Sequence, residues 1–141
     1  MARYMFDTNM CIYLMKNQPP HVAERFAQCF EGDVVLSAIT LAELEYGVTV
    51  SGDPLAARRA LLALVARVPV LPLNAAAAQA YGPVRAATRE RKADALDKLI
   101  AAHAIAEDLT VVTRNVRDFA AYPGLRVEDW TATPQVAAPG R

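Results

Sequence analysis

The stretch Tyr4-Met5-Phe6-Asp7-Thr8-Asn9 decides the fold predicted for this chain. Its apolar beginning predicts a buried strand over residues 3–6, and apolar side chains recur at helical spacing over residues 8–16. A strand that ends in a carboxylate and continues into a helix places that carboxylate, Asp7, at the C-terminal edge of a sheet. Ligands bind at this edge in open α/β sheets, so we expect Asp7 to belong to a binding site.

The alternation of strand and helix continues along the chain. Further strands are expected at 34–36, 68–73, 109–113 and 126–127. Helices are expected to begin near Pro20, Leu41, Pro54, Asn74 and Asp94. Prolines at 69 and 72 confine one strand to a sheet edge. Short apolar strands that alternate with helices predict an α/β fold with a mostly parallel central sheet between helices.

For two of these helices the sequence allows more specific predictions. The helix after Pro20 should bury one apolar stripe, made of Val22, Phe26, Cys29 and Phe30. The helix after Asn74 should run towards Lys92, with a kink at Gly82-Pro83.

Composition bounds the class of protein. A chain of 141 residues with 54% hydrophobic and 21% charged residues predicts one folded domain, here 1–130, followed by a flexible tail over 131–141. Lys+Arg and Asp+Glu both number 15, so polyanion binding would require local clustering of cations. No run of about 20 apolar residues and no signal sequence is present, which favours a cytoplasmic protein with Cys11 and Cys29 as reduced, buried thiols.

Two further acids, Glu43 and Asp97, lie on otherwise apolar helical segments. A charge in such surroundings is costly unless it is paired or bound to a metal. Glu43 is expected near the first turn of its helix, where the helix dipole alone would also stabilise it. Asp7 likewise has a structural alternative as a helix N-cap, and Asn9 as part of a local turn.

Asn115 and Asp118 follow the strand expected at 109–113 and are the remaining candidates for this sheet edge, a solvated turn being the alternative. Several carboxylates that converge repel one another unless a cation lies between them. Mg²⁺ prefers oxygen ligands and retains water molecules, one of which can be activated to attack a phosphate. The acids therefore predict phosphodiester cleavage with a divalent ion.

Cations recur close to Asp97 in the sequence. Arg85, Arg89 and Lys92 share helical spacing, and Arg114 with Arg117 follows the strand expected at 109–113. These five side chains are candidates for contact with RNA phosphates. The alternative is a solvated helix face, which is commoner for charges at this spacing.

Four stretches taken in order closely resemble the VapC-type toxins of the PIN-domain ribonuclease superfamily. They are Met5-Phe6-Asp7-Thr8-Asn9-Met10-Cys11-Ile12, Ser37-Ala38-Ile39-Thr40-Leu41-Ala42-Glu43-Leu44-Glu45-Tyr46-Gly47, Leu96-Asp97-Lys98-Leu99-Ile100-Ala101-Ala102-His103-Ala104, and Val112-Thr113-Arg114-Asn115 through Phe119 with Pro123-Gly124-Leu125. The resemblance covers residues 3 to 130. It implies a three-layer α/β/α sandwich and an endoribonuclease dependent on Mg²⁺ or Mn²⁺, which is the toxin of a bacterial toxin–antitoxin pair and cleaves structured RNA such as tRNA or rRNA loops.

The resemblance also implies roles for individual residues. Asp7, Glu43 and Asp97 match the metal-binding acids of the family, and Asp118 matches a fourth acidic position. Asn115 stands where many PIN domains carry Asp, which leaves open the number of ions. The stretch Lys92-Ala93-Asp94-Ala95 departs from the Gly-containing turn of many relatives.

The resemblance further implies a cognate antitoxin that blocks the active site, and a homodimer whose face we expect to include residues 41–65. Two other functions stay open. A haloacid-dehalogenase-like phosphohydrolase also has an Asp after its first strand, but it needs a second Asp two residues on, where Asn9 stands. A catalytically inert RNA-binding PIN-like module is the other alternative.

Overall fold

The computed structural model describes residues 1–132, and the chain alternates strands with helices as its sequence predicts. The strands are β1 (Tyr4–Phe6), β2 (Val34–Ser37), β3 (Val70–Leu71), β4 (Thr110–Val112) and β5 (Arg126–Glu128). The helices are α1 (Thr8–Lys16), α2 (Pro20–Ala27), α3 (Ala38–Thr49), α4 (Pro54–Arg67), α5 (Ala75–Ala87), α6 (Ala95–Ala106) and α7 (Val116–Phe119). The tail expected over 131–141 lies outside the described residues from residue 133 onward.

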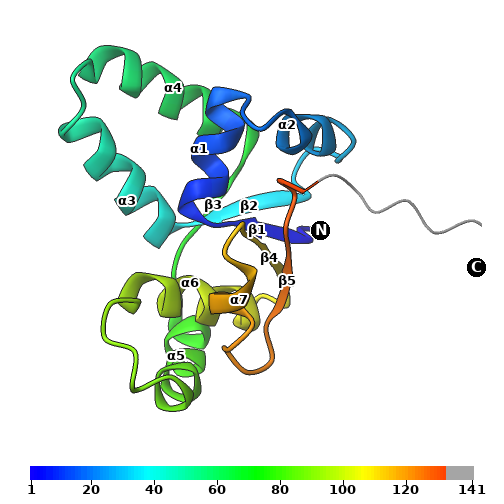
Figure 1. Cartoon of the computed structure of the whole chain (residues 1–141), viewed down its shortest axis with the longest axis vertical. Helices are drawn as coiled ribbons and strands as arrows, with labels where there is room; N and C mark the ends of the chain where they lie inside the picture. The colour runs from blue at the N-terminus through cyan, green and yellow to red at the C-terminus, as the bar shows by residue number, and fades with distance from the viewer. Residues whose placement is uncertain (133–141) are drawn as a thin grey trace, which may run out of the picture.

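The five strands form one sheet in the order β3-β2-β1-β4-β5, and every neighbouring pair is parallel. The chain first adds strands on one side of β1 and then crosses to add β4 and β5 on the other side (Figure 1). The strand order therefore reverses between β1 and β4. In open parallel sheets this switch point leaves a crevice at the carboxyl ends of the strands, where ligands bind.

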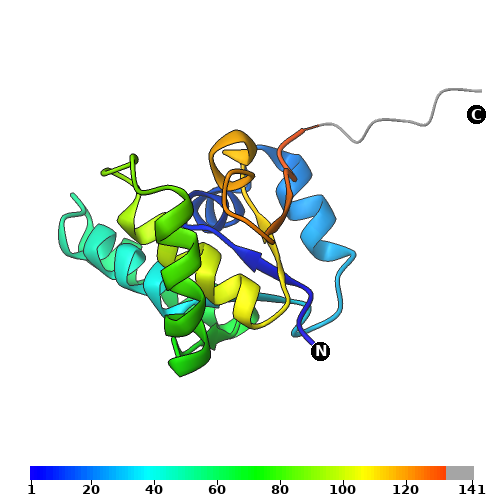
Figure 2. The same ribbon diagram turned by 90° about the horizontal axis from the view of Figure 1, so that it is seen from below.

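Each face of the sheet is covered by its own helices, which gives the expected three-layer α/β/α sandwich. Tyr4 and Phe6 point into a core shared with α1, α2, α3 and α4, whereas Met5 points into a core shared with α5, α6 and α7. Alternate residues of a strand face opposite sides of the sheet, so three apolar residues in a row serve both cores. Figure 2 shows β1 between α5 and α6 on one side and α2 on the other.

Trp130 closes the first core after the last strand. Its side chain is 2% exposed, and its ring makes edge-on contacts with Tyr4 and Phe6 at centroid distances of 5.0 and 5.2 Å. Arg25 covers the outer side of the indole ring at 4.8 Å. Residues up to Trp130 therefore pack as part of the fold.

Three details of the helices differ from the sequence-based expectations. The helix expected to reach Lys92 ends at Ala87, because Thr88 turns its hydroxyl back to the Val84 carbonyl and a turn follows. The stripe expected along α2 stops short, since the helix ends at Ala27 and Phe30 lies beyond it with 82% of its surface exposed. Cys11 is buried as expected, but Cys29 is only half-buried.

Within residues 1–132, no helix is long and apolar enough to cross a membrane.

Candidate active site

Asp7 lies at the switch point of the sheet and is held there by two hydrogen bonds. It directly follows β1, and only 6% of its surface is exposed. Its Oδ1 accepts the Met10 backbone N–H at 2.9 Å, and its Oδ2 accepts the Thr113 hydroxyl at 2.7 Å. Asp7 is therefore the N-cap of α1, as the structural alternative expected, and it also lies at the carboxyl edge of the sheet, where its role in a binding site stays a prediction.

Glu43 lies beside Asp7 but not in the first turn of its helix. α3 begins at Ala38, because Ser37 ends β2 and caps the helix by accepting the Ile39 N–H at 3.1 Å. Glu43 therefore falls in the second turn, where the helix dipole gives it little stabilisation. Its Oε1 instead accepts the Thr8 hydroxyl at 2.6 Å. This hydroxyl connects the residue after Asp7 to the carboxylate of α3.

Asp97 is the acid whose protonation is most strongly affected by the others. It lies in the first turn of α6 and is half-buried. Burial, followed by repulsion from four other carboxylates, raises the pKa of Asp97 to about 6; those acids are Asp7, Glu43, Asp94 and Asp118. The pKa of Asp7 is also raised, mainly by burial and further by Glu43 and Asp129. The predicted acids are therefore close enough to repel one another.

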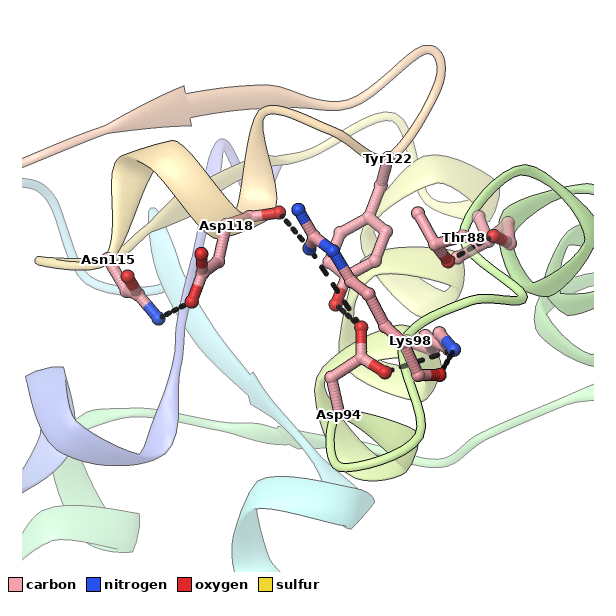
Figure 3. A network of polar contacts seen from close by, with 8 residues as sticks. Thr88, Asp94, Lys98, Asn115, Asp118 and Tyr122 are labelled. Carbon is pink, nitrogen blue, oxygen red and sulfur yellow. Dashed lines mark hydrogen bonds and ion pairs between the residues drawn. The ribbon is translucent and has the colours of Figure 1, made fainter.

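Asn115 is the N-cap residue of α7 and Asp118 lies within this helix; both are exposed. The Asn115 side-chain amide donates to the Asp118 Oδ2 at 2.7 Å, a contact drawn in Figure 3. The backbone N–H of Asn115 donates to the Thr113 hydroxyl at 2.9 Å, so this loop is tied to the group that holds Asp7. Asn9, by contrast, is exposed and makes no side-chain hydrogen bond within residues 1–132.

The structure adds three residues that the sequence did not single out. Thr8 and Thr113 each orient a predicted acid through a hydroxyl. Asp129 follows β5 and acts electrostatically on Asp7. The signal that identified Asp7, a carboxylate directly after a strand, applies equally to Asp129. The two threonines carry no such signal, because their partners lie far away in the sequence.

Asp94 and Lys98 form a buried ion pair beside the acids. The Lys98 Nζ lies 3.0 Å from the Asp94 carboxylate and donates to the Arg91 carbonyl at 2.7 Å. The Tyr122 hydroxyl donates to Asp94 at 2.7 Å (Figure 3). Burial alone raises the pKa of Asp94, but the hydrogen bonds from Tyr122 and Lys98 outweigh it and hold this pKa below its usual value.

The five predicted cations do not form one surface. Arg85, Arg89 and Lys92 line a hollow of about 220 Å³ where α5 leads into α6. Arg114 and Arg117 do not line it; both are exposed around the start of α7, close in sequence to Asn115 and Asp118.

The described acids do not form a complete metal cage. Within residues 1–132, no group of three or more His, Cys, Asp or Glu side chains has the arrangement of a ready-made metal site. His103, whose place near Asp97 in the sequence suggests packing, is fully buried, with its Nδ1 2.8 Å from the Ser37 hydroxyl.

Comparisons with known proteins agree with this fold. The PIN domain family matches residues 4–125. A tRNA(fMet)-specific endonuclease VapC from Shigella flexneri is 41% identical over 133 residues, which cover 93% of this chain and 100% of the relative. A chain of the DNA-bound VapBC from Salmonella typhimurium superimposes with a TM-score of 0.85 at 39% identity, over 92% of this chain and 99% of that one.

VapBC-1 from nontypeable Haemophilus influenzae gives a TM-score of 0.81 at 37% identity, over 92% of this chain and 98% of that one. The resemblance seen in four sequence stretches thus extends over nearly the whole fold. The chain belongs to the PIN domain family and groups within it with the VapC ribonucleases.

Proposed function

We propose that this chain is the endoribonuclease toxin of a toxin–antitoxin pair and that it cleaves RNA with Mg²⁺ or Mn²⁺ bound at Asp7, Glu43 and Asp97. The observation that carries the proposal is the 2.6 Å hydrogen bond from the Thr8 hydroxyl to Glu43, because it joins this carboxylate of α3 to the residue after Asp7 at the end of β1. The pKa of Asp97, raised by burial and then by repulsion from Asp7 and Glu43, agrees with acids that lie close together. Family membership supplies the reaction class, because the curated relatives are named endonucleases and ribonucleases.

The residues present fit a hard divalent ion. Carboxylate oxygens are the ligands that Mg²⁺ prefers, and this ion usually takes only one or two protein carboxylates while retaining water. A complete cage of three acids is therefore not required. When bound, such an ion activates a water molecule and neutralises negative charge on the phosphate that is attacked.

The chain's own groups prepare the crevice for this chemistry. The Met10 N–H and the Thr113 hydroxyl each hold one oxygen of Asp7, and both oxygens retain a lone pair for a cation. The Thr8 hydroxyl holds only Oε1 of Glu43, which leaves Oε2 for other contacts. Hydrogen bonds of this kind fix ligand orientation and are important for metal affinity. Asp118, whose Oδ2 accepts a hydrogen bond from the Asn115 side-chain amide, is the fourth acid of the proposal.

RNA with accessible backbone is the proposed substrate, such as a loop of tRNA or rRNA. Relatives from two bacteria are named tRNA(fMet)-specific endonucleases. Single-stranded loops offer phosphates and splayed bases that a protein can reach, unlike the interior of an A-form helix.

An antitoxin and a second copy of the chain are the proposed protein partners. Structures similar to this chain come from VapBC complexes, in which the toxin fold is bound to its antitoxin. An apolar groove of about 420 Å³ between α1, α3 and α4 reaches Glu43. A peptide bound there would end beside the acids and block them.

The decisive experiment is an RNA cleavage assay with chelation and replacement of the metal. We expect the protein to cut labelled tRNA in Mg²⁺ or Mn²⁺, to stop in EDTA, and to recover when excess Mn²⁺ is added. Cleavage that continues unchanged in EDTA would contradict the proposal. Tight RNA binding without turnover in Mn²⁺ would instead indicate an inert RNA-binding module.

The phosphohydrolase alternative has a separate readout. It requires a phosphoryl group on Asp7, and its second Asp is replaced by Asn9, which is exposed and outside the hydrogen-bond network of the acids. An aspartyl-phosphate detected on Asp7 by mass spectrometry after incubation with a phosphate ester would favour it.

A further inference from the structure

The hollow at the junction of α5 and α6 gathers more positive charge than its surroundings neutralise. Its lining residues are Tyr81, Arg85, Arg89, Arg91, Lys92, Ala95 and Lys98. Five of these side chains are cations, and among residues 1–132 the only carboxylate paired with any of them is that of Asp94. Like charges confined around one concave surface repel one another, so a bound anion would stabilise the arrangement.

Two of the cations are fixed and form the floor of the hollow. Lys98 is only 4% exposed and is held between Asp94 and the Arg91 carbonyl. Arg91 donates from Nη1 to the Asp118 carbonyl at 2.9 Å and lies over the Tyr122 ring at 5.7 Å. These contacts hold the floor in place without a ligand, as pre-organised binding requires.

The other three cations are available for a ligand. Arg85, Arg89 and Lys92 are exposed or half-exposed at the rim, and within residues 1–132 none of them forms an ion pair with an acid. The hollow measures about 220 Å³, which is smaller than the roughly 300–1,000 Å³ of a cofactor or drug site. A small charged group therefore suits it better than a whole cofactor.

The hollow also adjoins the acids. Lys98 follows Asp97 in α6, so the two side chains leave adjacent sides of the same helix. Arg91 links the hollow to α7 through the Asp118 carbonyl, and Figure 3 shows this connection beside the Asp94–Lys98 pair. A strand of nucleic acid that crosses the acids could thus place another phosphate in the hollow.

We propose that this hollow is a second phosphate subsite, which binds a phosphodiester of the RNA strand beside the one that is cut. Arg85, Arg89 and Lys92 make the phosphate contacts, and Tyr81 offers a ring against which a neighbouring base or ribose can stack. This inference rests on the proposed ribonuclease function and adds to it a contact that positions the substrate. The cations act on binding and take no part in bond cleavage.

The test measures RNA binding in EDTA, so it does not depend on cleavage. Fluorescence anisotropy of a labelled RNA hairpin is recorded at several salt concentrations for the full chain and for Arg85→Gln/Arg89→Gln. The matched control is Arg59→Gln/Arg126→Gln, which removes two exposed cations from α4 and β5. All four sites are exposed, and thermal unfolding checks that each variant remains folded.

We expect the hollow variant to bind RNA about five- to tenfold more weakly than the control at moderate salt. The slope of log K against log[salt] should become shallower by roughly 0.7 for each lost phosphate contact. Equal affinities and equal slopes for the two variants would overturn the subsite. This outcome would leave metal-dependent cleavage intact, whereas a failure of the proposed function would appear as absent cleavage with the binding difference preserved.

Steady-state cleavage supplies a second readout. A positioning role predicts a higher KM with kcat nearly unchanged for Arg85→Gln/Arg89→Gln. If inorganic phosphate at millimolar concentration stabilises the wild type but not the variant, while RNA binding is equal in both, the hollow takes free phosphate and the RNA assignment is wrong.

Discussion

The two helical layers expose opposite chemistry to solvent. On the α3–α4 side, large apolar residues are exposed, with Tyr46 at 69%, Leu55 at 71% and Leu62 at 57%. On the α5–α6 side, the corresponding exposed residues are cations around a hollow. Both layers pack against the sheet, each through its own buried core. The difference therefore lies in what each outer surface is suited to bind.

This contrast separates the partners of the molecule. Exposed apolar residues grouped on one surface are typical of protein interfaces, and clustered cations are typical of nucleic-acid contacts. The acidic crevice lies between the two layers, at the switch point of the sheet. A protein partner bound along α3 and an RNA strand bound along α6 would thus meet at the same carboxylates, which explains how one could exclude the other.

The largest expected effect comes from replacing one of the acids proposed to hold the metal ion. Asp7→Asn and Asp97→Asn should each lower RNA cleavage by about a thousandfold, because a bound ion supplies several kcal/mol to the transition state. Single-turnover cleavage of labelled tRNA in Mn²⁺ measures this loss. The control is Asp108→Asn, an exposed acid paired with Arg126 away from the crevice, which should cleave like wild type. Full activity in the Asp7 variant would contradict the assignment of the site.

A smaller loss is expected from the hydroxyl that orients Asp7. Thr113→Val keeps the size of the side chain but removes the 2.7 Å hydrogen bond, so cleavage should fall about ten- to a hundredfold. Thr110→Val, at the start of β4, is the control and should change little. Excess Mn²⁺ should restore part of the lost cleavage activity if the hydroxyl acts through metal affinity. Wild-type rates in Thr113→Val would show that Asp7 needs no such support.

The apolar layer has its own test. Leu55→Glu should raise the dissociation constant of a homodimer built on α3 and α4 by roughly 30-fold. This corresponds to about 2 kcal/mol, which is typical for the loss of a central interface residue. Light scattering at micromolar concentration measures the molecular mass. RNA cleavage by the mutant monomer shows whether the acidic site is affected. Leu96→Glu, which changes an exposed apolar residue outside this layer, should leave the mass unchanged. A monomeric wild type would refute the predicted dimer face.

The smallest expected effect is on stability and depends on pH. The pKa of Asp97 is higher in the folded protein than the ordinary value of 3.8, so the folded state binds this proton more readily than the unfolded chain. The metal-free protein should therefore lose stability as the pH rises from about 4 to about 6, and Asp97→Asn should remove this loss. At pH 7 in EDTA we expect Asp97→Asn to be more stable than the wild type by about 1–2 kcal/mol, after allowance for solvent screening.

Differential scanning calorimetry from pH 4 to 7 checks this expectation. The advantage of Asp97→Asn should shrink towards pH 4, where the wild-type carboxyl approaches protonation in both the folded and the unfolded state, and should diminish at pH 7 when Mg²⁺ is added. A difference in Tm that stays constant with pH would mean that Asp97 is not subject to the repulsion described above. Asp108→Asn again serves as the control.

Local spacing made much of the fold predictable. The helix over residues 8–16 and the cap at Asp53-Pro54 follow from periodicity and capping chemistry, which act within a few residues. The end of α5 at Ala87 was not predictable in this way, because the helical spacing of the cations continues past it while Thr88 ends the helix. The exposure of Phe30 could not be predicted either, because the apolar stripe of α2 continues in the sequence beyond the last turn of this helix.

The sequence by itself determined which acids follow strands or interrupt apolar helices, and hence that Asp7, Glu43 and Asp97 are the candidates for one site. It could do so because strand and helix periods fix where a side chain lies on its own element. Only the tertiary structure decided that Thr113 holds Asp7, that Thr8 holds Glu43, and that Lys98 forms the buried floor of a cationic hollow. These contacts join residues of different elements, and their geometry is set by how two separate cores pack against one sheet.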